Sequence, residues 1–281
     1  MDLLIEKSDL TLQLSMLGVT VTDVKASNTT VENKRESVNY RNGKIFYGAN
    51  HTEKKITVKG FYYAENEYED QVKQDELNGL FGGIEPFFIS RMYSTFPLYH
   101  YERPGQSKGF NFQKSEEQLP YRYHWKVIID GDIDYSFQGY SDKGLLYSIT
   151  INFVTSDTPY GITWPEDIEL RNNEYIAYSG TAPCSQLEYP FEIVLTSSIN
   201  QAKTFSLSLG NQQFTYQGTT IIKKDDVFRL KGSSFLLNEL NINDKTNIQY
   251  FTLIPNNENR MLVSTDFKGK IEMKNKVEFY L

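Results

Sequence analysis

The sequence has one cysteine, Cys184, among its 281 residues. A lone cysteine can form neither an internal disulfide nor a thiolate metal site. Long apolar runs are absent too, because no stretch approaches the roughly 18 apolar residues that a membrane helix needs. The N-terminal segment Met1–Lys7 is acidic with a short apolar run, which does not fit a signal peptide. These absences favour a soluble protein made in a reducing cytoplasm.

An excess of positive charge is also lacking, because 29 Lys and Arg stand against 36 Asp and Glu, a formal net charge of −7. This balance argues against a protein that neutralises many nucleic-acid phosphates. The histidines, His51, His100 and His124, have no paired spacing that would place two on one face, so no zinc site is predicted. No Walker A or G-x-G-x-x-G motif occurs. We therefore expect neither a metal nor a cofactor.

Two short motifs resemble functional sites but lack the context that those sites need. Gly105–Gly109 matches the G-x-S-x-G nucleophile elbow around Ser107, but no helical pattern follows it, which favours a loop over a hydrolase site. Asp130–Asp134 resembles the start of an EF-hand loop, but Tyr135 and Ser141 occupy the positions of the required Gly and Glu. A tight turn or an adventitious cation would explain the same residues. The sequence predicts no catalytic residue and no enzyme.

Aromatic residues are abundant, with 20 Tyr, 18 Phe and 2 Trp. Tyr and Phe favour strands, and turn residues recur between short alternating runs, as is typical of antiparallel sandwiches and barrels. The sequence therefore predicts a mainly β protein. One hairpin is expected over Phe205–Tyr216 around Gly210-Asn211, with Leu207 opposite Phe214, and another over Val227–Leu237.

A further hairpin is expected over Val38–Tyr47, because Asn42-Gly43 suits both central positions of a type I′ turn. The predicted cross-strand pairs are Val38 with Tyr47, Asn39 with Phe46, Tyr40 with Ile45, and Arg41 with Lys44. The last pair makes a basic tip on an acidic protein. The tip is either solvated or in contact with carboxylates of another chain.

One segment departs from the strand pattern. Residues Asn66–Phe81 are charged and free of proline, and Gly82-Gly83 follows them, which predicts a helix. Its apolar face is expected to consist of Tyr68, Val72, Leu77, Leu80 and Phe81.

Turn-rich residues between Thr155 and Asn173 separate two β patterns. They predict an N-terminal domain over residues 1–160, a linker over residues 161–173 and a C-terminal domain over residues 174–281. Within the first domain, Met92–Leu119 is an aromatic, loop-like stretch. Its rings either pack the domain and contact other subunits, or bind glycans or other partners. The candidate contact residues there are Tyr93, Phe96, Tyr99 and Tyr101.

Taken in order, several segments resemble the distal tail protein (Dit) family of siphophages that infect Gram-positive bacteria. In the first half they are Arg41–Gly48, Lys54–Val58, Leu77–Phe81, Glu85–Ile89, Ile149–Phe153 and Asp157–Gly161. In the second half they are Asn172-Asn173, Gly180–Pro183 and Phe251–Asn259. The resemblance covers essentially the whole chain.

The resemblance implies an N-terminal tail-tube-like β-barrel or sandwich with one helix and a protruding hairpin, followed by a C-terminal galectin-like β-sandwich. It also implies a virion protein of the distal tail tip, synthesised in the host bacterial cytoplasm. Such a protein forms a hexameric ring that joins the tail tube to the baseplate and receptor-binding apparatus and lets DNA pass. A host cell-wall glycan-binding adhesin is the alternative function.

The resemblance further implies the partners and the subunit interface. The partners are other copies of the chain, the major tail-tube protein, a tail-associated (Tal-like) hub protein, the tape measure protein and baseplate or receptor-binding proteins. DNA is present only in transit, and no membrane insertion is expected. The interface residues would be those of the hairpin that clasps the neighbouring subunit: Tyr40, Arg41, Asn42, Gly43, Lys44, Ile45, Phe46 and Tyr47.

Overall fold

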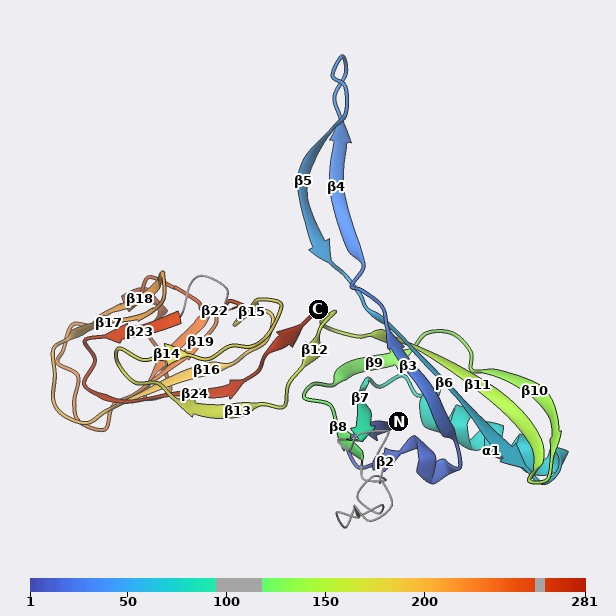
Figure 1. The fold of residues 1–281 in the computed structure, drawn as a ribbon. Coiled ribbons are helices and arrows are strands. Elements are labelled where there is room, and N and C mark those ends of the chain that lie inside the picture. The colour runs from blue at the N-terminus through green and yellow to red at the C-terminus, as the bar shows by residue number, and fades with distance from the viewer. Residues whose placement is uncertain (95–117, 256–260) are drawn as a thin grey trace, which may run out of the picture. The chain divides into compact units, whose positions relative to one another are not determined.

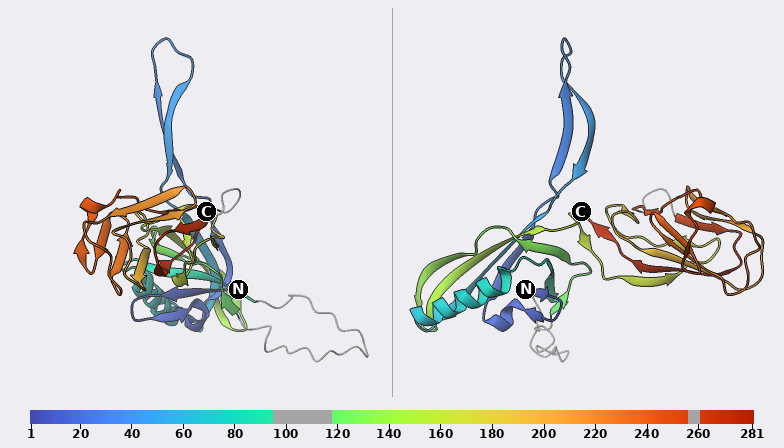
Figure 2. Two further views of the ribbon diagram at one scale, coloured as in Figure 1. Left: turned by 90° about the vertical axis from the view of Figure 1, so that its left-hand side faces the viewer. Right: turned by 180° about the vertical axis from the view of Figure 1, so that it is seen from behind.

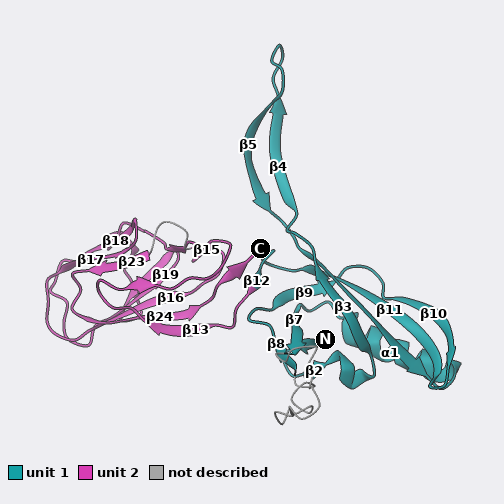
Figure 3. Ribbon diagram, viewed as in Figure 1, with its two compact units in different colours: residues 1–161 teal, residues 162–281 magenta. Residues whose placement is uncertain are grey.

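The computed structural model describes residues 1–94, 118–255 and 261–281. They form two compact units, Met1–Gly161 and Ile162–Leu281, which Figure 3 draws in different colours. Strands dominate both units, and the described residues contain one α-helix, so the predicted mainly β class is confirmed (Figure 1). Residues 161–173, assigned above to a linker, include β12 (Gly161–Ile162) and β13 (Glu166–Glu169), each of which pairs with another strand.

The first unit is built on a nine-stranded sheet. Its main path runs in the order β2-β1-β7-β9-β11-β6-β3, with β10 on β11 and β8 on β7. The strands are β1 (Asp2–Glu6), β2 (Thr11–Gln13), β3 (Thr20–Ala26), β6 (Lys55–Ala64), β7 (Phe87–Ser94), β8 (Gln118–Pro120), β9 (Trp125–Ile129), β10 (Asp134–Ser141) and β11 (Gly144–Thr155). A 3-10 helix covers Leu14–Leu17. The path ends, β2 and β3, are not paired with each other in the part of the chain described, so the sheet is open rather than a closed barrel.

The predicted helix is α1 (Glu67–Phe81). It begins where the Asn66 side chain accepts a 3.0 Å hydrogen bond from the Glu69 N–H, and it ends where the Gly82 N–H donates to the Asn78 carbonyl at 2.8 Å. Phe81 lies in the core, with its ring centre 5.4 Å from that of Phe153 on β11. Burial of Phe81 and of Leu77 one turn earlier therefore fixes the helix against the sheet.

The predicted apolar face of α1 is wrong at its N-terminal end. Tyr68 and Val72 are exposed, and the buried residue there is Asp70. Its carboxylate accepts hydrogen bonds from the Tyr62 hydroxyl at 2.6 Å and from the Gln74 amide at 2.9 Å. A buried carboxylate is tolerated when it is hydrogen-bonded in this way, and its partners turn the helix so that Tyr68 and Val72 face outward.

Two sheets packed face to face make the second unit. A six-stranded sheet has the order β13-β24-β16-β19-β20-β21, and a four-stranded sheet has the order β14-β23-β17-β18. The further strands are β14 (Tyr175–Ile176), β15 (Cys184–Ser185), β16 (Glu192–Ser197), β17 (Thr204–Leu209), β18 (Gln212–Gln217), β19 (Val227–Lys231), β20 (Ser234–Leu237), β21 (Leu240–Asn241), β22 (Thr252–Leu253), β23 (Met261–Thr265), β24 (Gly269–Lys276) and β25 (Phe279–Tyr280). β12 pairs with β25, β15 pairs with β22, and a 3-10 helix covers Asn243–Lys245.

The core of the second unit lies between its two sheets. The ring of Phe205 on β17 is 4.9 Å from that of Phe228 on β19, and Phe214 on β18 is 5.1 Å from Phe235 on β20. The predicted β-sandwich is therefore confirmed. The predicted hairpin register is confirmed as well, because Leu207 lies opposite Phe214 and β19 pairs directly with β20.

Candidate interaction surfaces

A two-stranded arm projects from the first unit, formed by β4 (Val31–Ser37) and β5 (Lys44–His51), as Figures 1 and 2 show. It continues the antiparallel pair of β3 and β6. At its root the Ser27 N–H donates to the Lys55 carbonyl at 2.8 Å, and the Thr30 N–H donates to the Glu53 carbonyl at 2.7 Å. One hydrogen-bonded ribbon thus runs from the nine-stranded sheet into the arm.

The residues predicted as a subunit contact lie in the arm, but the strand register of the arm differs from the predicted register. Ser37 pairs with Lys44 and Glu36 with Ile45, so the loop covers the six residues 38–43. The predicted pairing of Arg41 with Lys44 is wrong because the chain turns earlier. The Arg41 N–H donates to the Val38 carbonyl at 3.2 Å. The φ angles of Tyr40 and Gly43 are 65° and 85°.

A bulge shapes the middle of the arm. Lys34 pairs with Gly48 and Arg35 with Phe46, so Tyr47 is the extra residue of β5. Gly48 has a φ of 142°, which a side chain would strain. The bulge ends the strict alternation of side chains along β5.

The arm buries almost nothing. Every residue of β4 and of the loop is exposed, and in β5 only Ile45 and Gly48 are partly covered. Its exposed large apolar residues are Val31 (45%), Val38 (45%), Tyr40 (109%), Phe46 (59%) and Tyr47 (60%). Its charged residues are Glu32, Lys34, Arg35, Glu36, Arg41 and Lys44. None of these six forms an ion pair within residues 1–94, 118–255 and 261–281.

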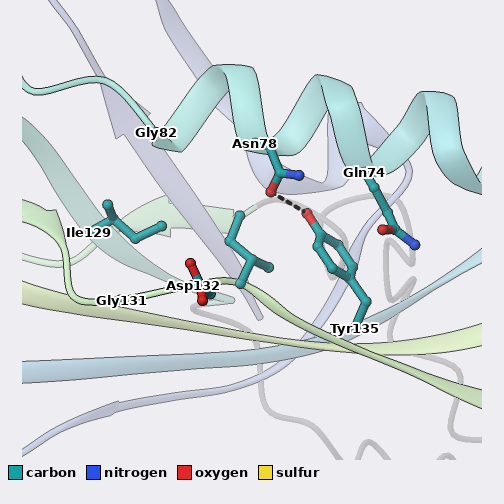
Figure 4. Close-up of a pocket in the computed structure, with 8 residues that line it drawn as sticks. Gln74, Asn78, Gly82, Ile129, Gly131, Asp132 and Tyr135 are labelled. Carbon is teal, nitrogen blue, oxygen red and sulfur yellow. Dashed lines mark hydrogen bonds between the residues drawn. The ribbon is translucent and has the colours of Figure 1, made fainter.

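A pocket of about 430 Å³ lies between α1 and the turn from β9 to β10 (Figure 4). The Tyr135 hydroxyl and the Asn78 side-chain oxygen meet there at 3.1 Å. Burial, together with nearby Asp70 and Asp75, raises the pKa of Tyr135 to about 12, so the hydroxyl keeps its proton at neutral pH. Tyr135 can therefore donate this bond, which ties the helix to the sheet.

The wall opposite α1 contains the motif that resembles a calcium loop. The segment forms a turn at Gly131, whose φ is 84°, and Asp130 pairs with Lys55 at 2.8 Å. In the described residues no group of three or more His, Cys, Asp or Glu side chains could hold a metal ion. The tight turn expected from the sequence is therefore present at Gly131.

A second pocket, of about 380 Å³, lies at one end of the nine-stranded sheet between β3 and the segments around β7 and β9. Tyr93 lines it, with Arg91 from the same strand and Asp23 from β3. We call this the aromatic pocket. Its other aromatic residues are Tyr121, Tyr123 and Trp125. They occupy every second position of the sequence as it enters β9, and this spacing is the one sequence signal that could have indicated the pocket.

The other predicted contact residues of the aromatic stretch, Phe96, Tyr99 and Tyr101, lie outside the described residues, as do His100 and the motif around Ser107. His51 lies at the root of the arm, where its Nδ1 is 2.7 Å from the Thr29 hydroxyl. His124 is buried in the first unit. The described histidines thus lie in different settings.

Cys184 is buried in the second unit. Burial and the nearby Glu188 raise the pKa of its thiol to about 12, so the unreactive protonated form dominates at neutral pH. No helix in the described part of the chain is long and apolar enough to cross a membrane.

Comparison with known proteins gives one family and one fold. The family model for the phage tail protein RIFT-related domain matches residues 8–155. The crystal structure of SPP1 Dit, described as a paradigm of the hub adsorption apparatus in Gram-positive infecting phages, aligns over 100% of this chain and 99% of its own. The TM-score is 0.66 at 11% sequence identity.

Further solved structures are less similar. Structures of the phage P2 baseplate in its activated conformation, with Ca or with Sr, cover 99% of this chain at 12% identity and a TM-score of 0.37. The alignment covers 96% of those chains. No curated protein matches the sequence.

Proposed function

Because the chain belongs to the family of phage tail proteins with a RIFT-related domain, we propose that it is a structural hub of a siphophage tail tip. Six copies form a ring that joins the tail tube to the baseplate and the receptor-binding apparatus, and DNA passes through it. The fold shared with SPP1 Dit, a hub protein, supports this role. The protein acts by assembly, not by catalysis, and its place is the distal end of the virion tail.

The arm is the observation that carries the proposal. A two-stranded hairpin that packs on nothing is marginally stable in water. This arm nevertheless presents Tyr40, Phe46 and Tyr47 to solvent. Covering these side chains with a second copy of the chain would remove their apolar surface from water, which favours association by roughly 25 cal/mol per Å².

A ring also requires two different complementary faces on each subunit, so that one copy binds the next by rotation. The arm supplies one such face. The residues predicted as the interface, Tyr40 to Tyr47, lie in its loop and in the first half of β5. Arg41 and Lys44 bring positive charge to this face, and the neighbour would receive them with carboxylates.

The partners of the ring follow from the same role. The proposed hub contacts the major tail-tube protein on one side, and a Tal-like hub protein and baseplate or receptor-binding proteins on the other. The tape measure protein and DNA occupy or cross its opening.

Light scattering after size exclusion, over a series of concentrations, tests self-assembly. A mass that rises toward six times 32.6 kDa, with six-fold rings in negative stain, is the expected result. Arg41→Glu with Lys44→Glu should shift ring formation to higher concentration. The matched control is the double reversal of Lys203 and Lys224, which are exposed in the second unit. Rings that form equally well with the reversed arm would contradict the assigned interface.

A further inference from the structure

The aromatic pocket lies where the residues on the interior face of the nine-stranded sheet change from apolar to aromatic and polar. Along β7, Phe87 and Ile89 are core residues, and the next residues of the same parity, Arg91 and Tyr93, line the pocket. Because side chains alternate along a strand, these four point to the same side of the sheet. The apolar core thus continues into a hollow lined by aromatic and polar groups.

Four aromatic rings form a continuous series in this hollow. The ring centres of Tyr93 and Tyr121 are 5.3 Å apart, those of Tyr121 and Tyr123 4.8 Å, and those of Tyr123 and Trp125 5.4 Å. All three contacts are edge-to-face, so each ring holds the next in place. A pre-formed aromatic wall of this kind can pack against the C–H groups of a ligand.

Two buried donors in the same pocket lack an acceptor. Among the described residues, neither Arg91 Nε nor Trp125 Nε1 has a hydrogen-bond partner, although both nitrogen atoms are buried. Leaving a buried donor unpaired destabilises the folded state, so native proteins usually satisfy such groups with a ligand or water. Trp125 lines the pocket although it is only 4% exposed.

The β3 wall of the pocket carries both charges, because Asp23 and Lys25 line it and both are exposed. Asp23 is exposed there and, as a carboxylate, can only accept hydrogen bonds. Arg91 and Trp125 can only donate. Neither Asp23 nor Arg91 takes part in an ion pair with another described residue. A ligand that pairs with all of these groups must therefore offer acceptors to Arg91, Trp125 and Lys25, a donor to Asp23 and an apolar face along the rings.

We propose that the aromatic pocket binds a neutral saccharide. A sugar hydroxyl both donates and accepts, so one sugar can pair with Arg91, Trp125 and Asp23 together. Its C–H faces pack on the tyrosine rings. A simple anion would be attracted by Arg91 and Lys25 and repelled by Asp23, but it has no C–H face to pack on the rings. The volume of about 380 Å³ lies within the range of small-molecule pockets.

The two tryptophans of the chain allow a direct test. Trp164→Phe leaves Trp125 as the sole tryptophan, so its fluorescence reports on this pocket alone. The full chain is titrated with triacetylchitotriose and with maltotriose as neutral saccharides. Sodium acetate and triglycine serve as carboxylate and peptide probes. A saturable change with at least one saccharide, and none with acetate or triglycine, is expected.

Tyr121→Ala, made in the Trp164→Phe chain, should weaken saccharide binding about tenfold, equivalent to about 1.4 kcal/mol. Tyr250→Ala in the second unit is the matched control and should bind as before. No saturable change with either saccharide would overturn the proposal. So would an equal response to acetate or triglycine, or unchanged binding by a folded Tyr121→Ala chain. The assay needs no ring, so its outcome is independent of the hub proposal.

Discussion

The hydroxyl of Tyr62 on β6 lies 2.6 Å from the Asp70 carboxylate on α1, and both residues are buried. Burial, and then the hydrogen bond to Asp70, raises the pKa of Tyr62, so its hydroxyl remains a donor at neutral pH. This contact decides which side of the N-terminal half of α1 faces the sheet.

Tyr62→Phe removes that donor and leaves the buried carboxylate with one fewer partner. We expect the free energy of unfolding to fall by about 1–3 kcal/mol. Urea unfolding followed by circular dichroism measures the change. Tyr68→Phe on the exposed side of α1 is the control and should be neutral. Equal stability of the Tyr62 and Tyr68 variants would show that the hydrogen bond contributes nothing.

The exposed apolar residues of the arm should matter for assembly and not for the stability of the subunit. Tyr40→Ser with Phe46→Ser is therefore expected to change the free energy of unfolding of the monomer by no more than about 0.5 kcal/mol. The same change should abolish or strongly weaken ring formation in sedimentation velocity. Ile199→Ser with Tyr250→Ser, exposed in the second unit, should leave assembly intact. A large loss of monomer stability would mean that the arm packs within its own subunit.

Gly144 begins β11 with a φ of +111°, and a Cβ there would lie 2.4 Å from the Ala64 carbonyl oxygen. Gly144→Ala must therefore shift the backbone, at a cost of about 1–3 kcal/mol. Thermal and urea unfolding measure it. Gly83→Ala is the control, because apart from its chain neighbours no heavy atom of the described residues lies within 4 Å of its Cβ position. A Gly144→Ala chain as stable as the Gly83→Ala chain would contradict the close approach.

Burial lowers the pKa of His124 from 6.5 to about 4. Between these values the unfolded chain binds a proton at His124 that the folded chain does not. The free energy of unfolding therefore decreases as pH falls from 6.5 toward 4. His124→Gln cannot titrate. Its stability should therefore decline less steeply than that of the parent over this range, as urea unfolding at several pH values will show. Parallel pH curves would mean that His124 has an ordinary pKa in the folded state.

Lys276 on β24 is buried, and its ammonium lies 2.6 Å from Glu166 and 3.3 Å from Glu278. Lys276→Met keeps the aliphatic volume but leaves the mostly buried Glu278 without its cation, which should cost about 3 kcal/mol. Lys270→Met on the same strand removes an exposed ion pair with Glu272 and should cost less than about 1 kcal/mol. Chemical denaturation of both variants compares them. Similar losses in the two would indicate that burial adds nothing to the Lys276 pair.

Hairpin register was predictable where a buried face constrains it. Leu207 and Phe214 are fully buried, so a slip by one residue would expose the whole inward set, and the predicted pairing is the observed one. The arm has no buried face. Asn42-Gly43 therefore competes with other turns on local energy alone, and the chain turns at Val38–Arg41 instead.

For α1 the sequence predicts the extent of the helix but not which side faces the sheet. Its extent was predictable from Asn66 and Gly82, which supply local caps. Its orientation was not, because hydropathy ranks Asp70 as an exposed residue and gives no weight to a hydroxyl on another strand. The aromatic pocket combines Asp23, Arg91 and Trp125 from three separate strands, so only the fold brings these groups together.

Cys184 is buried, and the chain has no other cysteine. The native subunit should therefore not react with thiol reagents. A cysteine introduced at the tip of the arm, for example Asn42→Cys, would be the single reactive position. Spin labels or fluorophores can then be attached to that point alone. Distances between the labels of neighbouring copies would map the assembled particle, with no need to alter the native thiol.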